Sequence, residues 1–196
     1  MFKLTMIAAM AALTDGVANA APTMIDFDAG TSGTAIGGFY TSQGVTFSNA
    51  EFAANFSLAG SSGTLGVSAP GTYKFGPSNA VVASFTSPVT SVTVRGIDVG
   101  AAGIRLTAYN AANVILGSST AFGSGIGVGA FFDVTTSYGG IAKVAFSQDN
   151  PCCSDGVLFD NLSFSGGVPD APAWALLIVG FGLTGTAVRA RRAVAA

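Results

Sequence analysis

The chain contains no histidine, one tryptophan and only two cysteines, and charged residues make up 9% of it. Without histidine, the Ser-His-Asp and Cys-His nucleophile systems are excluded and the usual zinc ligand is absent. Between residues 21 and 167 the basic residues are few and scattered: Lys74, Arg95, Arg105 and Lys143. Nucleic-acid binding requires clustered Lys and Arg side chains that displace counterions, so the sequence predicts no nucleic-acid partner.

Charge is absent altogether from residues 171–188, near the C-terminus. As a helix, these 18 residues would reach about 27 Å, close to the roughly 30 Å hydrocarbon core of a bilayer. The segment is apolar on every side and contains three glycines, which suits a membrane helix better than a soluble amphipathic one. Arg189, Arg191 and Arg192 follow it, so the positive-inside rule places the C-terminus in the cytoplasm. The sequence therefore predicts a single C-terminal transmembrane helix.

A short motif lies at the start of that segment. It consists of Val168, Pro169, Asp170, Ala171, Pro172, Ala173, Trp174 and Ala175. Together with the apolar helix and the arginine cluster, residues 168–192 resemble the PEP-CTERM sorting signal in its Trp-Ala variant. The family pattern has Glu and Pro where this sequence has Asp170 and Ala171. The resemblance implies export by a Gram-negative bacterium, an inner-membrane-anchored intermediate and cleavage by an exosortase, a membrane transpeptidase of which this chain is the substrate.

The N-terminus independently predicts export. Lys3 provides a basic n-region, residues 4–13 form an apolar stretch too short to span a bilayer, and Ala18-Asn19-Ala20 is a small-residue cleavage site. Residues 1–20 are therefore predicted to be a signal peptide. The exported domain is expected to comprise residues 21–167, which is the length of one ordinary domain.

Strand and turn residues dominate residues 21–167, which are rich in Gly, Ser, Thr, Ala, Val and Phe. Breaks containing glycine, such as residues 100–103 and 138–140, separate short runs of alternating polarity. The expected strands are residues 24–27, 44–47, 81–85, 91–95, 104–109, 130–134, 142–146 and 157–164. The sequence therefore predicts an all-β, antiparallel sandwich of jelly-roll type.

The last expected strand contains a carboxylate at a position that alternation assigns to the core. If Leu158, Leu162 and Phe164 face inward, Asp160 does too, and an unpaired buried carboxylate is costly. A β-bulge that turns the charge outward, an ion pair with Arg95 or Arg105, or a Ca²⁺ ion would each relieve this cost.

Residues 25–28 and 159–164 resemble the first and last strands of jelly-roll carbohydrate-binding modules. That resemblance implies a structural calcium ion at Asp28 and Asp160, with Asp26 as a further ligand. The alternative is that these three residues are solvated turn or bulge residues.

The two cysteines, Cys152 and Cys153, are adjacent in an exported chain. When oxidised, they either form a vicinal disulfide or crosslink two chains. Neighbouring Cα atoms are about 3.8 Å apart, which is inside the usual disulfide minimum and so makes the ring strained. We favour the intramolecular ring over the crosslink.

These features predict a non-catalytic binding or structural protein of the cell surface or extracellular matrix, associated with exopolysaccharide. One alternative is a hydrolase of matrix glycans that uses Asp26, Asp28 or Asp133. The other is an ice-binding adhesin.

Overall fold

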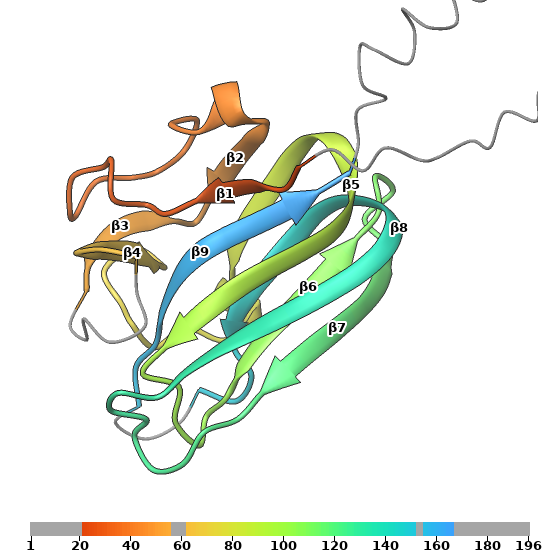
Figure 1. Ribbon diagram of the computed structural model, residues 1–196. Coiled ribbons are helices and arrows are strands. Elements are labelled where there is room, and N and C mark those ends of the chain that lie inside the picture. Colours follow the sequence, from red (N-terminus) through yellow and green to blue (C-terminus); the bar gives the residue numbers. More distant parts are fainter. Residues whose placement is uncertain (1–20, 56–61, 152–154, 167–196) are drawn as a thin grey trace, which may run out of the picture.

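The computed structural model describes residues 21–55, 62–151 and 155–166 (Figure 1). These ranges form strands and two single-turn 3₁₀ helices, and no α-helix occurs in them. The elements are β1 (Thr23–Ile25), η1 (Thr41–Gln43), β2 (Val45–Ser48), β3 (Glu51–Ala54), β4 (Leu65–Ser68), η2 (Pro77–Asn79), β5 (Val81–Ile97), β6 (Ile104–Tyr109), β7 (Ile115–Ala121), β8 (Phe131–Gln148) and β9 (Leu158–Ser165).

All strand pairs are antiparallel, and the strands form two layers that share β5 and β8. In one layer, the first part of β5 pairs with β2 and with the second part of β8, which continues to β6 and β7. In the other layer, the second part of β5 lies between β9 and the first part of β8. β9 continues to β1 and β4, and β4 pairs with β3. The prediction of an antiparallel sandwich is therefore confirmed.

The two shared strands are longer than the sequence predicts. Residues 81–85 and 91–95 belong to the single strand β5, and β8 runs through the expected break at residues 138–140. The pairing of β5 with β8 changes register between Ser84 and Val89, and again between Val89 and Ser91. Both strands curve at this point in Figure 1 and pass from one layer into the other. Glycine therefore marks a bend within β8, where the sequence predicted a turn between two strands, and Pro88 lies at the bend of β5.

Phenylalanine fills the space between the layers. Phe27, Phe52, Phe75, Phe146 and Phe159 are all fully buried. Phe159 meets Phe146 and Phe75 edge to face, with ring centroids 4.9 and 5.9 Å away. Such aromatic contacts stabilise a core beyond the effect of buried area alone. Aromatic rings are therefore the largest side chains of a core that is otherwise built of Val, Ile, Leu and Ala.

Several predicted features lie outside the described residues. These are the signal peptide at residues 1–20, Cys152 and Cys153, and the sorting segment at residues 168–192, including the predicted membrane span. Within residues 21–55, 62–151 and 155–166, no helix has the length and apolar character needed to cross a bilayer.

Candidate functional site

Of the three aspartates that the sequence singled out, the structure brings the carboxylates of Asp28 and Asp160 together with the backbone carbonyl of Asp26. β1 ends at Ile25, which pairs with Leu162 of β9, so the residues after β1 lie beside the middle of β9. Ser62 connects the acidic residues: its Oγ lies 3.2 Å from the Asp26 carbonyl oxygen, 3.4 Å from Asp28 Oδ2 and 3.1 Å from Asp160 Oδ2. We call Asp26, Asp28, Asp160 and Ser62 the acidic cluster.

Asp160 is completely buried, yet its carboxylate accepts backbone hydrogen bonds. Ser62 N donates to Oδ2 at 2.9 Å, and Asn161 N donates to Oδ1 at 2.7 Å. Burial raises the pKa of Asp160 and the negative charge of Asp28 raises it further, while the hydrogen bonds from Ser62 and Asn161 oppose both effects. Asp160 is therefore easier to protonate than an ordinary aspartate.

Asp28 is held by the same short segment of chain. Thr64 N and Leu65 N donate to Asp28 Oδ1 at 2.9 and 3.1 Å. A Cβ atom on Gly63 would overlap the Asp28 carboxylate, so the backbone can approach this closely only because residue 63 is glycine. Residues 62–65 thus form a cap of N–H donors over Asp28 and Asp160.

Strict alternation would place Asp160 in the main core, but a β-bulge, one of the alternatives that the sequence left open, turns it away. Thr93 pairs with Ser163 but Arg95 pairs with Asp160, so two residues of β9 oppose one residue of β5. The bulge contains Asn161, whose φ is +50°. Phe159 and Leu162 therefore both point into the main core, while Asp160 lies on the opposite face.

The bulge does not expose the charge, however, because Ser62 and residues 26–28 cover it. The two arginines considered as partners of Asp160 form ion pairs elsewhere, Arg95 with Asp133 and Arg105 with Asp149.

Sequence reasoning did not connect Tyr40 with this cluster. Its side chain is 3% exposed, and within the described part of the chain its hydroxyl has no hydrogen-bond partner. Burial raises the pKa of Tyr40 to about 12, with further contributions from the charges of Asp26, Asp28 and Asp160. Nothing in the sequence signals this, because Tyr40 and Asp160 are far apart along the chain.

The described residues contain no group of three or more His, Cys, Asp or Glu side chains close enough together to hold one metal ion. Backbone N–H groups already donate hydrogen bonds to the carboxylate oxygens of Asp28 and Asp160. Calcium at Asp26, Asp28 and Asp160 therefore stays a prediction.

A second polar surface covers the outer side of β9, the second part of β5 and the first part of β8. Val92, Val94 and Val134 point inward, and the residues between them point out. We call this outward set the hydroxyl face; it consists of Ser91, Thr93 and Arg95 on β5, Asp133, Thr135 and Ser137 on β8, and Ser163 and Ser165 on β9.

Cross-strand pairs organise this face. The hydroxyls of Ser91 and Ser137 are 3.1 Å apart, and those of Thr93 and Thr135 are 2.8 Å apart. One step further along, Arg95 donates to both carboxylate oxygens of Asp133, at 2.7 and 2.8 Å. The hydroxyl face is therefore flat, polar and held in place by its own hydrogen bonds.

Arg95 also determines the charge state of Asp133. Its hydrogen bonds lower the pKa of Asp133, burial raises the pKa by less, and the positive charge of Arg95 lowers it further. A general acid for glycoside hydrolysis needs the opposite shift. The hydrolase alternative therefore gains no general acid from Asp133.

The opposite pKa shifts of Asp160 and Asp133 predict opposite pH dependences. A carboxyl with a raised folded pKa binds more protons in the folded state, so its contribution to stability falls as pH rises above its unfolded pKa, about 3.9, through its folded pKa. Without divalent cations, Asp160→Asn should remove this fall. The contribution of Asp133 to stability should rise with pH between its lowered folded-state pKa and its unfolded-state pKa, and Asp133→Asn should remove this rise. Urea midpoints between pH 2 and 8 measure both slopes, and identical profiles for wild type and Asp160→Asn would contradict the assignment.

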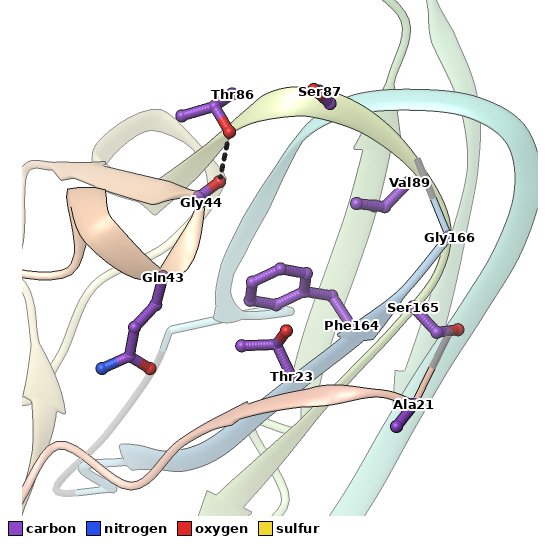
Figure 2. Close-up of a pocket in the computed structure, with 10 residues that line it drawn as sticks. All are labelled: Ala21, Thr23, Gln43, Gly44, Thr86, Ser87, Val89, Phe164, Ser165 and Gly166. Carbon is purple, nitrogen blue, oxygen red and sulfur yellow. Dashed lines mark hydrogen bonds between the residues drawn. The ribbon is translucent and has the colours of Figure 1, made fainter. Parts of the chain in front are cut away.

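A cavity of about 140 Å³ lies beside both ends of the described domain. Figure 2 shows Phe164 at its centre, facing Thr23 and Gln43, with Ala21 and Gly166 at its edge. Thr86 Oγ1 donates to the Gly44 carbonyl at 3.3 Å on its far side. Among the described residues, none of those that line it carries a charged side chain. The lining of the cavity thus shares no residue with the acidic cluster.

Comparisons with solved structures find distant likenesses, one of which is to an adhesin domain. The fold is similar to the K2 cleaved adhesin domain of Lys-gingipain, with 15% sequence identity and a TM-score of 0.48. The match covers 74% of this chain and 99% of that domain. No family model and no curated protein matches the chain.

Proposed function

We propose that this chain is an exported, non-catalytic β-sandwich protein that binds a polysaccharide of the extracellular matrix through its hydroxyl face. The observation that carries the proposal is the arrangement of that face: two cross-strand hydroxyl pairs, followed by a bidentate ion pair between Arg95 and Asp133. An extended polysaccharide presents many hydroxyls along a line, and a flat row of fixed donors and acceptors complements it.

An exposed aromatic ring borders the same face. Phe131 begins β8, is 45% exposed, and lies beneath the Arg95 guanidinium, whose carbon is 5.7 Å from the ring centroid. The apolar face of a sugar ring stacks on such a ring, while Arg95 and Asp133 supply polar contacts beside it. This pairing of an aromatic ring with charged, planar side chains supports a carbohydrate ligand.

The proposed location rests on the two ends of the sequence. Residues 1–20 have the pattern of a cleaved signal peptide, and residues 168–192 resemble an exosortase sorting signal. In the proposed route, the chain is exported, held in the inner membrane by residues 171–188, and released to the cell surface or matrix by an exosortase.

The proposal includes a structural calcium ion at Asp26, Asp28 and Asp160. Its support is that carboxylates from both ends of the domain converge on Ser62, and that Asp160 is fully buried beside Asp28. Calcium is bound by carboxylate and backbone oxygens of this kind. A bound calcium ion would supply positive charge that offsets the repulsion between the Asp28 and Asp160 carboxylates. It would also join the first and last strands.

Binding is tested by co-sedimentation of the full chain, in detergent, with exopolysaccharide from the producing cell. The paired substitution Thr93→Val and Thr135→Val removes two hydroxyls but keeps the side-chain shape. With about 1 kcal/mol for each lost hydrogen bond, affinity should fall roughly tenfold or more. The matched control is Thr46→Val with Thr120→Val, on the outer side of the other layer, which should bind like wild type. Equal binding by both pairs would reject the hydroxyl face.

Two further readouts separate the alternatives. Reducing ends that accumulate with wild type but not with Asp26→Asn or Asp28→Asn would indicate a hydrolase. Thermal hysteresis that is lost in the Thr93→Val and Thr135→Val protein would indicate ice binding, because the same hydroxyl rows would then meet ice.

A further inference from the structure

A second group of buried oxygens lies at the end of the sandwich where β5 and β8 finish and β9 begins (Figure 1). Asp98 follows β5, Gln148 is the last residue of β8, and Asp155 precedes β9. Their side chains are 8%, 1% and 3% exposed. None of the three belongs to the acidic cluster or to the hydroxyl face.

Asp155 is only half satisfied. Its Oδ2 accepts a hydrogen bond from Ala102 N at 3.2 Å, whereas Oδ1 has no partner in the part of the chain that the structure describes. A buried carboxylate oxygen without a partner costs free energy, and buried charges in proteins are paired or bind metals. Asp155 Oδ1 is therefore open to a cation.

Gln148 provides an independent observation at the same place. Its Nε2 donates to the Asp155 carbonyl oxygen at 3.2 Å, which fixes the amide against residue 155. Its Oε1 is buried and, among the described residues, has no hydrogen-bond partner. Two oxygens without a described partner, one on a carboxylate and one on an amide, thus belong to residues that a hydrogen bond joins.

Asp98 adds a second negative charge. Its φ is +58°, a left-handed conformation that aspartate tolerates better than most residues, and its Oδ1 accepts a hydrogen bond from Gly129 N at 2.7 Å. Burial raises the pKa of Asp155 and the charge of Asp98 raises it further, while the Ala102 hydrogen bond and the charge of Lys74 lower it. A cation would relieve the repulsion between the two carboxylates.

Backbone oxygens also approach this point. A Cβ atom on Gly100 would lie 2.5 Å from Asp155 Oδ2 and 2.6 Å from the Gly125 carbonyl oxygen, so only glycine permits the turn after β5 to pack here. The connections 98–103 and 123–130 are further joined by the hydrogen bond from Gly123 N to Gly100 O, at 3.0 Å. The group is therefore enclosed by backbone rather than open to bulk water.

We propose that Asp155 and Gln148, with the Asp98 carboxylate beside them, form a calcium site that is separate from Asp26, Asp28 and Asp160. Calcium accepts a mixture of carboxylate, side-chain amide and backbone carbonyl oxygens in flexible geometry. Magnesium requires a near-ideal octahedron, and zinc prefers nitrogen and sulfur ligands. The ion would tie the β5–β6 turn and the β7–β8 connection to the segment before β9.

The test uses the full chain in detergent, stripped of divalent cations with a chelator and then titrated with calcium in a calorimeter. The wild type should bind an ion that Asp155→Asn and Gln148→Met each fail to bind. At calcium one hundred times the dissociation constant, this site should raise the wild-type Tm by roughly 5 to 10 °C. Asp155→Asn should lose that increase. In chelator, Asp155→Asn should melt at or above wild type, because it removes a buried charge yet keeps an oxygen for the Ala102 N–H.

Two matched variants assign the ion to this site. Asp160→Asn removes a buried carboxylate from the acidic cluster, and Asp133→Asn removes an exposed one from the hydroxyl face; both should retain the ion bound by Asp155. The proposal is overturned if Asp155→Asn binds as many calcium ions as wild type. It is also overturned if Asp155→Asn melts well below wild type in chelator, since the protein itself would then satisfy the carboxylate.

Discussion

Replacement of Phe27 by alanine is expected to lower the free energy of unfolding by about 3–5 kcal/mol, as for other fully buried aromatic residues. Phe27 is 0% exposed and packs edge to face on Tyr40 and Phe47, with centroids 5.8 and 5.5 Å away. Alanine would leave a cavity between these rings, and the surrounding strands could close it only in part. Equilibrium urea unfolding, followed by tyrosine fluorescence, measures the loss.

The effect should extend to the acidic cluster because Phe27 lies between Asp26 and Asp28. Its φ is +58°, an unusual conformation for a bulky residue, which the packing of its ring maintains. The matched control is Phe122→Ala, since Phe122 is 53% exposed and should cost much less. Equal losses for Phe27→Ala and Phe122→Ala would show that Phe27 does not anchor the first strand.

Asp160→Ala is expected to cost about 2–4 kcal/mol of unfolding free energy. The substitution leaves the N–H groups of Ser62 and Asn161 buried without their acceptor, at about 1–3 kcal/mol each. Asp160→Asn keeps an acceptor oxygen and removes the buried charge, so its cost should be clearly smaller. Asp133→Ala, which breaks an exposed ion pair, should cost at most about 1 kcal/mol. An alanine variant as stable as the asparagine variant would contradict this account of the N–H cap.

The same variants test calcium at the acidic cluster. If an ion binds Asp26, Asp28 and Asp160, Asp160→Asn should lose one calcium ion that Asp155→Asn retains, and the chelator should then destabilise it less than wild type. A calcium titration of Asp160→Asn that is indistinguishable from wild type would remove the ion from this cluster. That result would leave the hydrogen bonds from residues 62–65 to Asp28 and Asp160 unaffected.

Much of the architecture could be predicted from local patterns. Alternation at residues 104–109 and 91–95 is strong, and both segments are strands whose apolar residues face the core. β3, β4 and β7 were not predicted. β4 and β7 contain glycine and serine, and β3 is only four residues long, so none has a clear alternation; their partners in the sheet make them strands. The bends in β5 and β8 resemble turns in sequence because Pro88 lies at the bend of β5, and Gly139 and Gly140 lie in the middle of β8.

The acidic cluster could be predicted only in outline. The first and last expected strands each carried Asp residues, and the pairing of β1 with β9 brings them together. Strict alternation would place Asp160 in the core, and a bulge was one of the alternatives that the sequence left open; the bulged residue Asn161 reverses the faces of β9 on either side of it. Ser62, about a hundred residues before Asp160, carries no pattern that would reveal its position.

The hydroxyl face depends on pairing across the sheet. Thr93 and Thr135 are 42 residues apart, and each alone is an ordinary solvent-facing threonine. Only the register of β5 with β8 makes them neighbours and aligns Arg95 with Asp133. The sequence likewise does not predict the buried oxygens of Gln148 and Asp155. They come together only because the β5–β6 turn, the β7–β8 connection and the segment before β9 pack against one another.

One experiment tests the central claim, binding without catalysis, most directly. The full chain in detergent is incubated with exopolysaccharide from the producing cell, and retained protein and new reducing ends are measured in the same sample. We predict saturable retention with no increase in reducing ends, and weaker retention of the Thr93→Val and Thr135→Val protein. Reducing ends that accumulate with time, or no retention at any polysaccharide concentration, would contradict the proposed function.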